Sequence, residues 1–75
     1  MTVNKFKKEI IFRLDKRDIE VNCITVKGYK DNQVKSVEVS VNGFGGADVL
    51  VAIADALDEI HEVYGISVDK RLVEF

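Results

Sequence analysis

The feature that most constrains the fold is an amphipathic stretch from Ala47 to Tyr64, which glycines bound on both sides. Its apolar side chains recur every three or four residues, the period of an α-helix, so they share one broad arc of the helical surface. The arc contains Val49, Leu50, Ile53, Leu57, Ile60 and Tyr64. Gly65 follows at the position where many helices end in a left-handed residue. The sequence therefore predicts a helix over 47–64 that packs one face against a core.

A segment near the start of the sequence, about 5–14, alternates apolar and polar side chains. Phe6, Ile10, Phe12 and Leu14 share one parity, and charged residues occupy much of the other. A period of two is typical of a half-buried strand. The pattern predicts a first strand here.

Two further segments before the helix have strand character. The first, about 19–26, changes its apolar parity near 22–23, which predicts either a β-bulge or a strand that is apolar on both faces. The second, about 37–41, alternates valine with polar residues. Loops of about four or five residues join the three predicted strands, so we expect an antiparallel meander.

A last alternation after the helix, at about 66–74, predicts a possible final strand. The crossover through the helix would return it parallel to the first strand, where it could extend the sheet. We therefore expect one small α+β domain over residues 1–75, of order β-β-β-α(-β). Its sheet would be mainly antiparallel, with three to four strands and one amphipathic helix on one face. Whether the final strand joins the sheet of its own chain or of another stays open at this point.

The short chain leaves little room for a large core. A domain of 75 residues is near the lower limit for standing alone, and such domains often recruit disulfides, a metal or a partner chain. One cysteine, Cys23, excludes an internal disulfide, and one histidine, His61, leaves no Cys/His cluster for zinc. We expect self-association instead, as a homodimer or a larger assembly.

The sequence contains no apolar run of the length that spans a membrane. The first residues also lack the pattern of a signal peptide. A lone thiol fits a reducing compartment, so cytoplasmic localisation without membrane association is the expectation.

The glycine-rich turn at 42–46 raises the question of a phosphate site, because helix N-termini attract anions. Asp48 stands where a dinucleotide-binding fingerprint needs its third glycine, and no Lys-Ser or Lys-Thr pair follows Gly46. We expect Asp48 to cap the helix itself and to repel a second anion. The turn is therefore interpreted as a flexible helix start without a cofactor, and Phe44 as a possible contact for a protein partner.

Charge is segregated along the chain, although the formal net charge is only −2. Nine basic and five acidic residues fall in 1–35, whereas two basic and eight acidic residues fall in 36–75. The predicted helix has no lysine or arginine, and its acidic helix ridge consists of Asp55, Asp58, Glu59 and Glu62. Like charges four residues apart slightly destabilise a helix. The ridge is either a solvated face or a surface that a partner with basic groups binds.

The basic first half supports an alternative hypothesis, in which a sheet binds nucleic acid. The candidate residues are Lys5, Lys7, Arg13, Lys16 and Arg17. Three antiparallel strands followed by a helix is the layout of some small DNA-binding domains, which is an analogy of fold alone. Acidic residues interleave with these basic ones, which disfavours contact with phosphates.

No group of residues predicts catalysis or metal binding. His61 lies at the edge of the apolar arc, and Cys23 falls on an apolar parity and is expected to be a buried, inert thiol. A ligand pocket of about 300 Å³ or more is hard to enclose in so small a domain.

The expected function is therefore non-catalytic protein–protein interaction. The protein would be a homo-oligomeric accessory, regulatory or inhibitor protein whose partner is itself or a protein with a basic surface. Besides the acidic helix ridge, it would use apolar residues of the sheet face that one helix cannot cover. This expected apolar sheet face contains Ile11, Ile24, Val26 and Val34.

Overall fold

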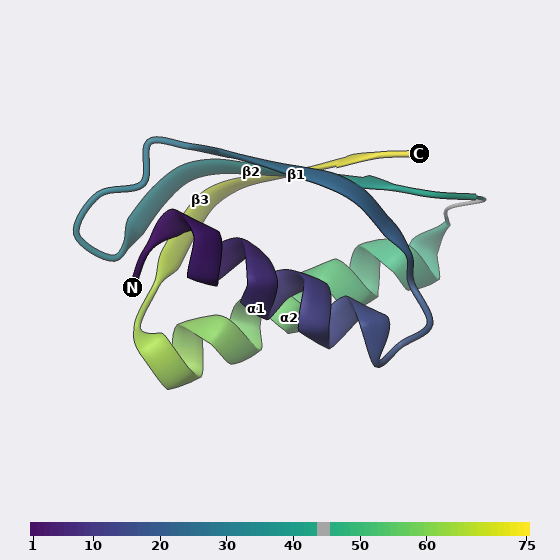
Figure 1. Cartoon of the computed structure of the whole chain (residues 1–75), viewed down its shortest axis with the longest axis horizontal. Helices are drawn as coiled ribbons and strands as arrows, with labels where there is room; N and C mark the ends of the chain where they lie inside the picture. The colour runs from purple at the N-terminus through teal and green to yellow at the C-terminus, as the bar shows by residue number, and fades with distance from the viewer. Residues whose placement is uncertain (44–45) are drawn as a thin grey trace.

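The computed structural model describes residues 1–43 and 46–75, and shows a small α+β fold with two helices on one face of a three-stranded sheet (Figure 1). The elements are α1 (Val3–Asp15), β1 (Val21–Lys27), β2 (Gln33–Val41), α2 (Ala47–Tyr64) and β3 (Ser67–Glu74). Phe44 lies outside the described residues, so its contact with a partner stays a prediction.

The sheet is mixed, not mainly antiparallel. β2 lies in its centre, with β1 antiparallel on one side and β3 parallel on the other. Val39 of β2 stands opposite Ile24 of β1 and Val73 of β3. The final strand thus joins the sheet of its own chain, beside β2, and the predicted three-strand meander is reduced to one hairpin.

The predicted first strand is wrong, because its residues form helix α1. Phe6, Ile10 and Leu14 suggested an alternation, yet they are also four residues apart, and all three are fully buried on one side of the helix. Phe12, which shares their parity, is instead 54% exposed. A spacing of four satisfies both the strand and the helix period, and the exposure of Phe12 is what separates them.

Local signals explain why this segment is helical. Thr2 caps the helix by accepting a hydrogen bond from the Lys5 N–H at 3.1 Å. Glu9 and Arg13 form an i,i+4 ion pair at 2.7 Å. Lysine, glutamate and arginine between the apolar residues are good helix formers, whereas β-branched residues are few.

Strand β1 contains the predicted irregularity. Its register on β2 shifts between Val21 and Cys23, which makes the parity change a bulge and not a strand apolar on both faces. Beyond the shift, Ile24 is buried and Val26 packs against the core. Cys23 is exposed, so the expectation of a buried thiol is wrong.

The sheet face away from the helices is mainly polar, which corrects the expected apolar sheet face. Glu38, for example, stands between Thr25 of β1 and Leu72 of β3. The structure places three of the four expected members against the core: Ile24, Val26 and Val34. The fourth, Ile11, is an exposed residue of α1. Two helices cover the apolar side of the sheet where one was expected, so little apolar sheet surface remains for a partner.

Helix α2 has the predicted bounds. Gly65 adopts φ 72°, and its N–H donates to the His61 carbonyl at 2.8 Å, as expected for a left-handed end. At the other end, Gly46 is the N-cap and Asp48 lies in the first turn. The expectation that the Asp48 side chain caps the helix is therefore wrong, although its charge still suits the positive end of the helix dipole.

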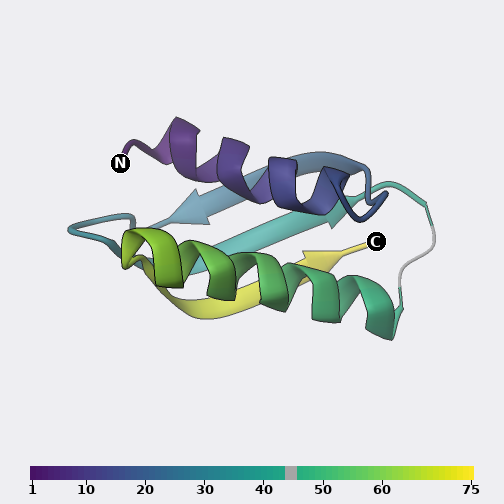
Figure 2. The same ribbon diagram turned by 90° about the horizontal axis from the view of Figure 1, so that it is seen from below.

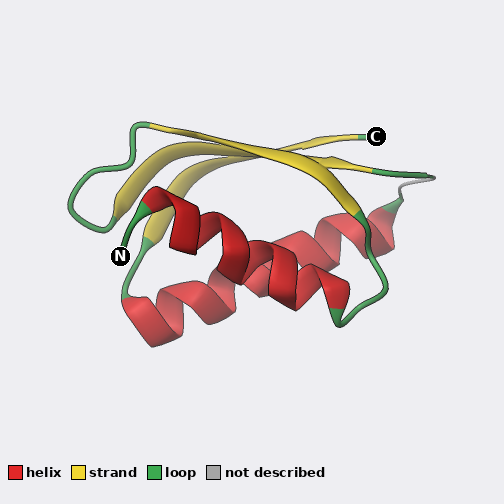
Figure 3. Cartoon of the chain, viewed as in Figure 1, coloured by secondary structure: helices red, strands yellow, loops and turns green. Residues whose placement is uncertain are grey.

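The two helices lie side by side and run antiparallel, on the same face of the sheet (Figures 2 and 3). α1 contacts β1 and α2 contacts β3. No helix in the described part of the chain is long and apolar enough to cross a membrane. One broad surface of the molecule is thus formed entirely by the outward sides of α1 and α2.

Candidate interaction surface of the helix layer

Exposed apolar side chains concentrate on the helices. Among the described residues, the large apolar side chains that the helices leave exposed are Ile11, Phe12, Leu50, Val51, Val63 and Tyr64. Strand β3 adds only Leu72. Exposed apolar side chains of a small protein often belong to a binding surface, and here most of them lie on the helix layer.

The outward side of α1 carries positive charge around an aromatic ring. Lys5, Lys8, Phe12 and Lys16 are all exposed and follow one another at helical spacing, opposite the buried face. Lys16 Nζ lies 4.3 Å from the centroid of the Phe12 ring, a cation–π contact. Lysine and phenylalanine therefore form one preassembled cationic group on this helix.

The outward side of α2 carries the opposite charge. Val51, Asp55, Asp58 and Glu62 are exposed and also follow one another at helical spacing. We call these four residues, together with Lys5, Lys8, Phe12 and Lys16, the outer helix face. The face is split lengthwise, with lysines on α1 and carboxylates on α2.

A seam of ion pairs joins the two helices beneath this face. Glu59 of α2 forms ion pairs with Arg17 at 2.8 Å and with Arg13 at 3.2 Å. Arg13 also holds Glu9, which accepts a further hydrogen bond from Tyr64 Oη at 3.2 Å. The contacts run from Glu9–Tyr64 to Arg13–Glu59, so residue numbers rise along α1 as they fall along α2. The seam fixes the level of each helix relative to the other, that is, its position along the common axis direction.

Arg13 is the least exposed charged group of the seam, with its side chain 13% exposed. Its Nε atom is buried 3.2 Å from Glu59 Oε1, but it has no hydrogen-bond acceptor in suitable geometry within the described chain. We regard this contact as an ion pair without a hydrogen bond. The bonds that Arg13 does donate go to the Glu9 side chain and to the Glu9 carbonyl.

The arginines of the seam lower the pKa of both seam carboxylates, Glu9 and Glu59. The hydrogen bond from Arg13 lowers the pKa of Glu9 below its ordinary value of 4.5, although partial burial opposes the effect. The hydrogen bond from Arg17 likewise lowers the pKa of Glu59. The folded protein therefore favours the ionised form of both groups.

Only part of the acidic helix ridge is free to contact a partner. Glu59 belongs to the seam, and Asp58 accepts a hydrogen bond from Arg71 of β3 at 3.0 Å. Asp55 and Glu62 have no ion pair among residues 1–43 and 46–75. Two of the four ridge carboxylates thus remain for a partner.

The basic residues proposed for nucleic acid lie on or just after α1, not on a sheet. Arg13 and Arg17 turn toward α2, where both form ion pairs with Glu59. Lys5 and Lys16 lie on the outer helix face, whereas Lys7 is half-buried. Only part of the set is therefore available to any partner, and the carboxylates of α2 lie alongside.

Ile11 is set apart from the outer helix face. At 100° per residue it lies on the flank of α1 that is remote from Glu9 and Arg13, and hence from α2.

Lys8, which the sequence interpretation did not single out, belongs to the outer helix face. The missed signal was Lys5, Lys8, Phe12 and Lys16 at helical spacing, which becomes visible only once the segment is assigned as a helix.

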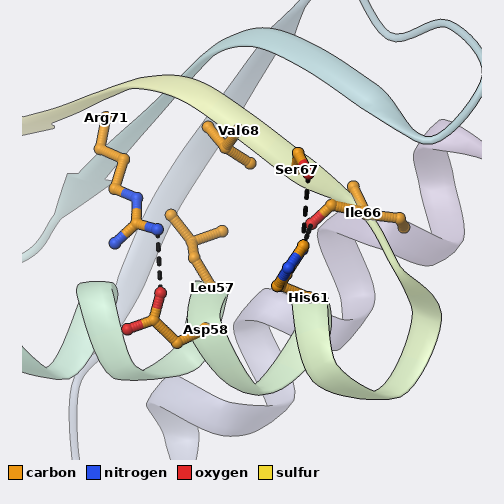
Figure 4. Close-up of a pocket in the computed structure, with 7 residues that line it drawn as sticks. All are labelled: Leu57, Asp58, His61, Ile66, Ser67, Val68 and Arg71. Carbon is orange, nitrogen blue, oxygen red and sulfur yellow. Dashed lines mark hydrogen bonds and ion pairs between the residues drawn. The ribbon is translucent and has the colours of Figure 1, made fainter.

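A small pocket between α2 and β3 gathers the only histidine with a serine, an aspartate and an arginine (Figure 4). His61 Nδ1 lies 3.2 Å from the Ile66 carbonyl oxygen and 3.5 Å from Ser67 Oγ. A catalytic triad would need the serine and its orienting group on different ring nitrogens, and Asp58 is engaged by Arg71. The volume, about 190 Å³, is also small for a ligand site. The histidine joins the end of α2 to the start of β3.

No group of three or more metal-ligating side chains occurs among the residues that the structure describes. Comparison of the chain with protein-family models, with curated proteins and with solved structures found no match.

Proposed function

We propose that the protein is a non-catalytic interaction protein that binds a protein partner, either a second copy of itself or another protein, through its outer helix face. The observation that supports this proposal best is Phe12, a large aromatic side chain that is 54% exposed, stacked by Lys16 and surrounded by charged groups. Aromatic side chains at the centre of a charged rim are the usual anchors of protein interfaces. The role is that of an accessory, regulatory or inhibitor protein, in the reducing cytoplasm that the free thiol of Cys23 suits.

Charge on the face supports a protein partner over a membrane or a polyanion. The lysines of α1 and the carboxylates of α2 present both signs within one surface. A partner that satisfies both must itself carry both signs in the matching order, which proteins do and polyphosphates do not.

Co-purification with the tagged chain tests the proposal. Wild type should retain a protein partner from its cell of origin, which includes an untagged copy of the chain, and Phe12→Ala should lose most of it. Leu72→Ala is the matched control, because Leu72 is an apolar residue of similar exposure, 40%, on the opposite face. Equal retention by Phe12→Ala and wild type, or capture of neither an untagged copy of the chain nor another protein, would contradict the proposal. Circular dichroism verifies that both variants remain folded.

Nucleic-acid binding is the second candidate, favoured by the three exposed lysines that follow one another along α1. Phosphate contacts would make binding strong at low salt and weak at high salt. Fluorescence anisotropy with short single and double strands measures this directly. Absence of binding at low salt would eliminate the candidate and leave the protein-interaction proposal intact.

A further inference from the structure

We propose that the partner of the outer helix face is a second copy of this chain, related by a two-fold axis that runs parallel to the helices. In this dimer α1 of each copy lies on α2 of the other. The inference rests on the proposed function, because it uses the same face, and it deepens that function by identifying the partner and the geometry.

Charge segregation selects the direction of the axis. Two kinds of two-fold axis can lie in the plane of a face-to-face contact between helix layers. An axis perpendicular to the helices would stack α1 on α1 and place lysines against lysines. An axis parallel to the helices places the lysines of α1 against the carboxylates of α2, twice. Only the second arrangement is electrostatically self-complementary.

The free carboxylates form part of a socket for an aromatic side chain. Asp55, Asp58, Glu59 and Glu62 stand at i, i+3, i+4 and i+7, the four positions that surround a hole on a helix surface. Phe12 is the projecting side chain of the facing helix. Its ring face already carries Lys16, and its electropositive edge suits the carboxylates that line the hole.

Symmetry also fixes the level at which Phe12 arrives. Rotation about an axis parallel to the helices leaves every residue at its original level along them. Within one chain, Arg13 is level with Glu59 and Glu9 is level with Tyr64. Phe12 of the second copy therefore reaches α2 close to Glu59, within the hole, and no sliding is required.

The neighbouring lysines then meet the two available carboxylates. Lys16 and Lys8 lie one turn on either side of Phe12. Because the facing helices run antiparallel, Lys16 approaches Asp55 and Lys8 approaches Glu62 of the other copy. None of these four side chains has an ion-pair partner in the described residues of its own chain.

The size of the face is compatible with a specific but reversible dimer. The chain extends 34 × 20 × 19 Å between Cα atoms, so a face along the long axis measures about 700 Å². Stable complexes bury about 800 Å² on each partner. We therefore expect a dimer that dissociates on dilution.

Two charge-reversed variants test the geometry. Lys8→Glu/Lys16→Glu places acidic side chains at all four of these contact positions, and Asp55→Lys/Glu62→Lys places basic side chains at all four. Each variant alone should be monomeric by sedimentation equilibrium, with the dissociation constant raised at least about tenfold. An equimolar mixture should form heterodimers, because both contacts between unlike variants are again complementary. A chain that carries all four substitutions should regain the homodimer.

Lys27→Glu/Lys70→Glu is the matched control, since both lysines are exposed strand residues that flank Ser36 of β2 in the sheet register. The same charge change there should leave dimerisation intact. A monomeric wild type at high concentration, a dimer of either reversed variant alone, or a mixture that stays monomeric would overturn the inference. If a monomeric wild type still captures a different protein through Phe12, the proposed function stands without the dimer. The fourfold variant keeps the test decisive if one double variant fails to fold.

Discussion

At the scale of single residues, the seam between the helices depends on Arg13. This guanidinium lies between two carboxylates, Glu9 and Glu59, and is nearly buried. Removing a partly buried charge leaves the opposite charges without compensation, which costs more than the ion pair itself contributes. The seam is therefore expected to be more sensitive to loss of the arginine than to loss of either carboxylate.

Arg13→Ala should accordingly lower the free energy of unfolding by about 1–3 kcal/mol, because Glu9 loses its arginine and Glu59 keeps Arg17 alone. The comparison is Arg71→Ala, which removes an exposed ion pair with Asp58 and should cost about 0–1 kcal/mol. Urea denaturation of both variants measures the difference. Equal losses would show that Arg13 is only another surface charge.

Acid should weaken the same seam. Both pKa values are lowered by folding, so each carboxylate stabilises the native state fully above its ordinary value of 4.5. That contribution disappears as the pH falls below 4.5 and through the lowered pKa. Glu9→Gln/Glu59→Gln should therefore flatten the loss of stability between neutral pH and pH 3, measured by urea denaturation. Curves that stay parallel to wild type would contradict the role of these two groups.

At the scale of elements, α1 shows where the sequence interpretation fails. Alternation and helical period share the spacing of four residues, and Phe6, Ile10 and Leu14 satisfy both. The signals that favour a helix in this segment are the Thr2 cap and the Glu9–Arg13 pair, and a pattern of alternating polarity contains neither. By contrast, α2 was predictable because glycines bound it and its apolar arc is long.

Phenylalanine substitutions distinguish the helix from the strand. Phe6→Ala should lower the free energy of unfolding by about 3–5 kcal/mol, because Phe6 is fully buried and its ring packs 5.8 Å from that of Tyr29. Phe12→Ala should cost less than about 1 kcal/mol, because Phe12 is exposed in α1. A strand over 5–14 would place both residues on the same buried face, so similar losses from thermal or urea unfolding would argue against the helix.

The candidate site was only half predictable for the same reason. The acidic helix ridge could be identified because α2 was assigned correctly. Its basic counterpart could not, because Lys5 and Phe12 fall on different faces of a strand but on one face of a helix. The ion pairs of Asp58 and Glu59 depend on Arg71 and Arg13, which are distant in sequence from their partners or belong to the misassigned element.

At the scale of the whole molecule, the core lies between the sheet and the helix layer, and the two outward faces differ in character. The sheet presents polar side chains, whereas the helix layer presents Phe12 and segregated charges. The expected apolar sheet face followed from assigning one helix too few. Two helices cover one face of the three strands, and the other face of the sheet is exposed to water.

This division predicts opposite outcomes for two strand residues. Leu72→Ser should change the free energy of unfolding by no more than about 0.5 kcal/mol and leave the oligomeric state unchanged, because Leu72 faces away from the helices. Ile24→Ala should cost about 2–4 kcal/mol, because Ile24 is buried beneath them. Thermal unfolding together with sedimentation tests both. Dissociation of an oligomer by Leu72→Ser would show that the sheet face is used after all.

The position of β2 in the centre of the sheet has a consequence for how the chain folds. Its pairing with β1 closes only the short loop 28–32, whereas its pairing with β3 must wait for residues 42–66 to fold back along the sheet. Local contacts form faster than distant ones, because less chain entropy is lost in closing them. Before β3 docks, the hydrogen-bonding edge of the valine-rich strand β2 is open to other chains. Newly made molecules are therefore most vulnerable to aggregation during that interval, and early formation of α2 shortens it by bringing β3 back to the sheet.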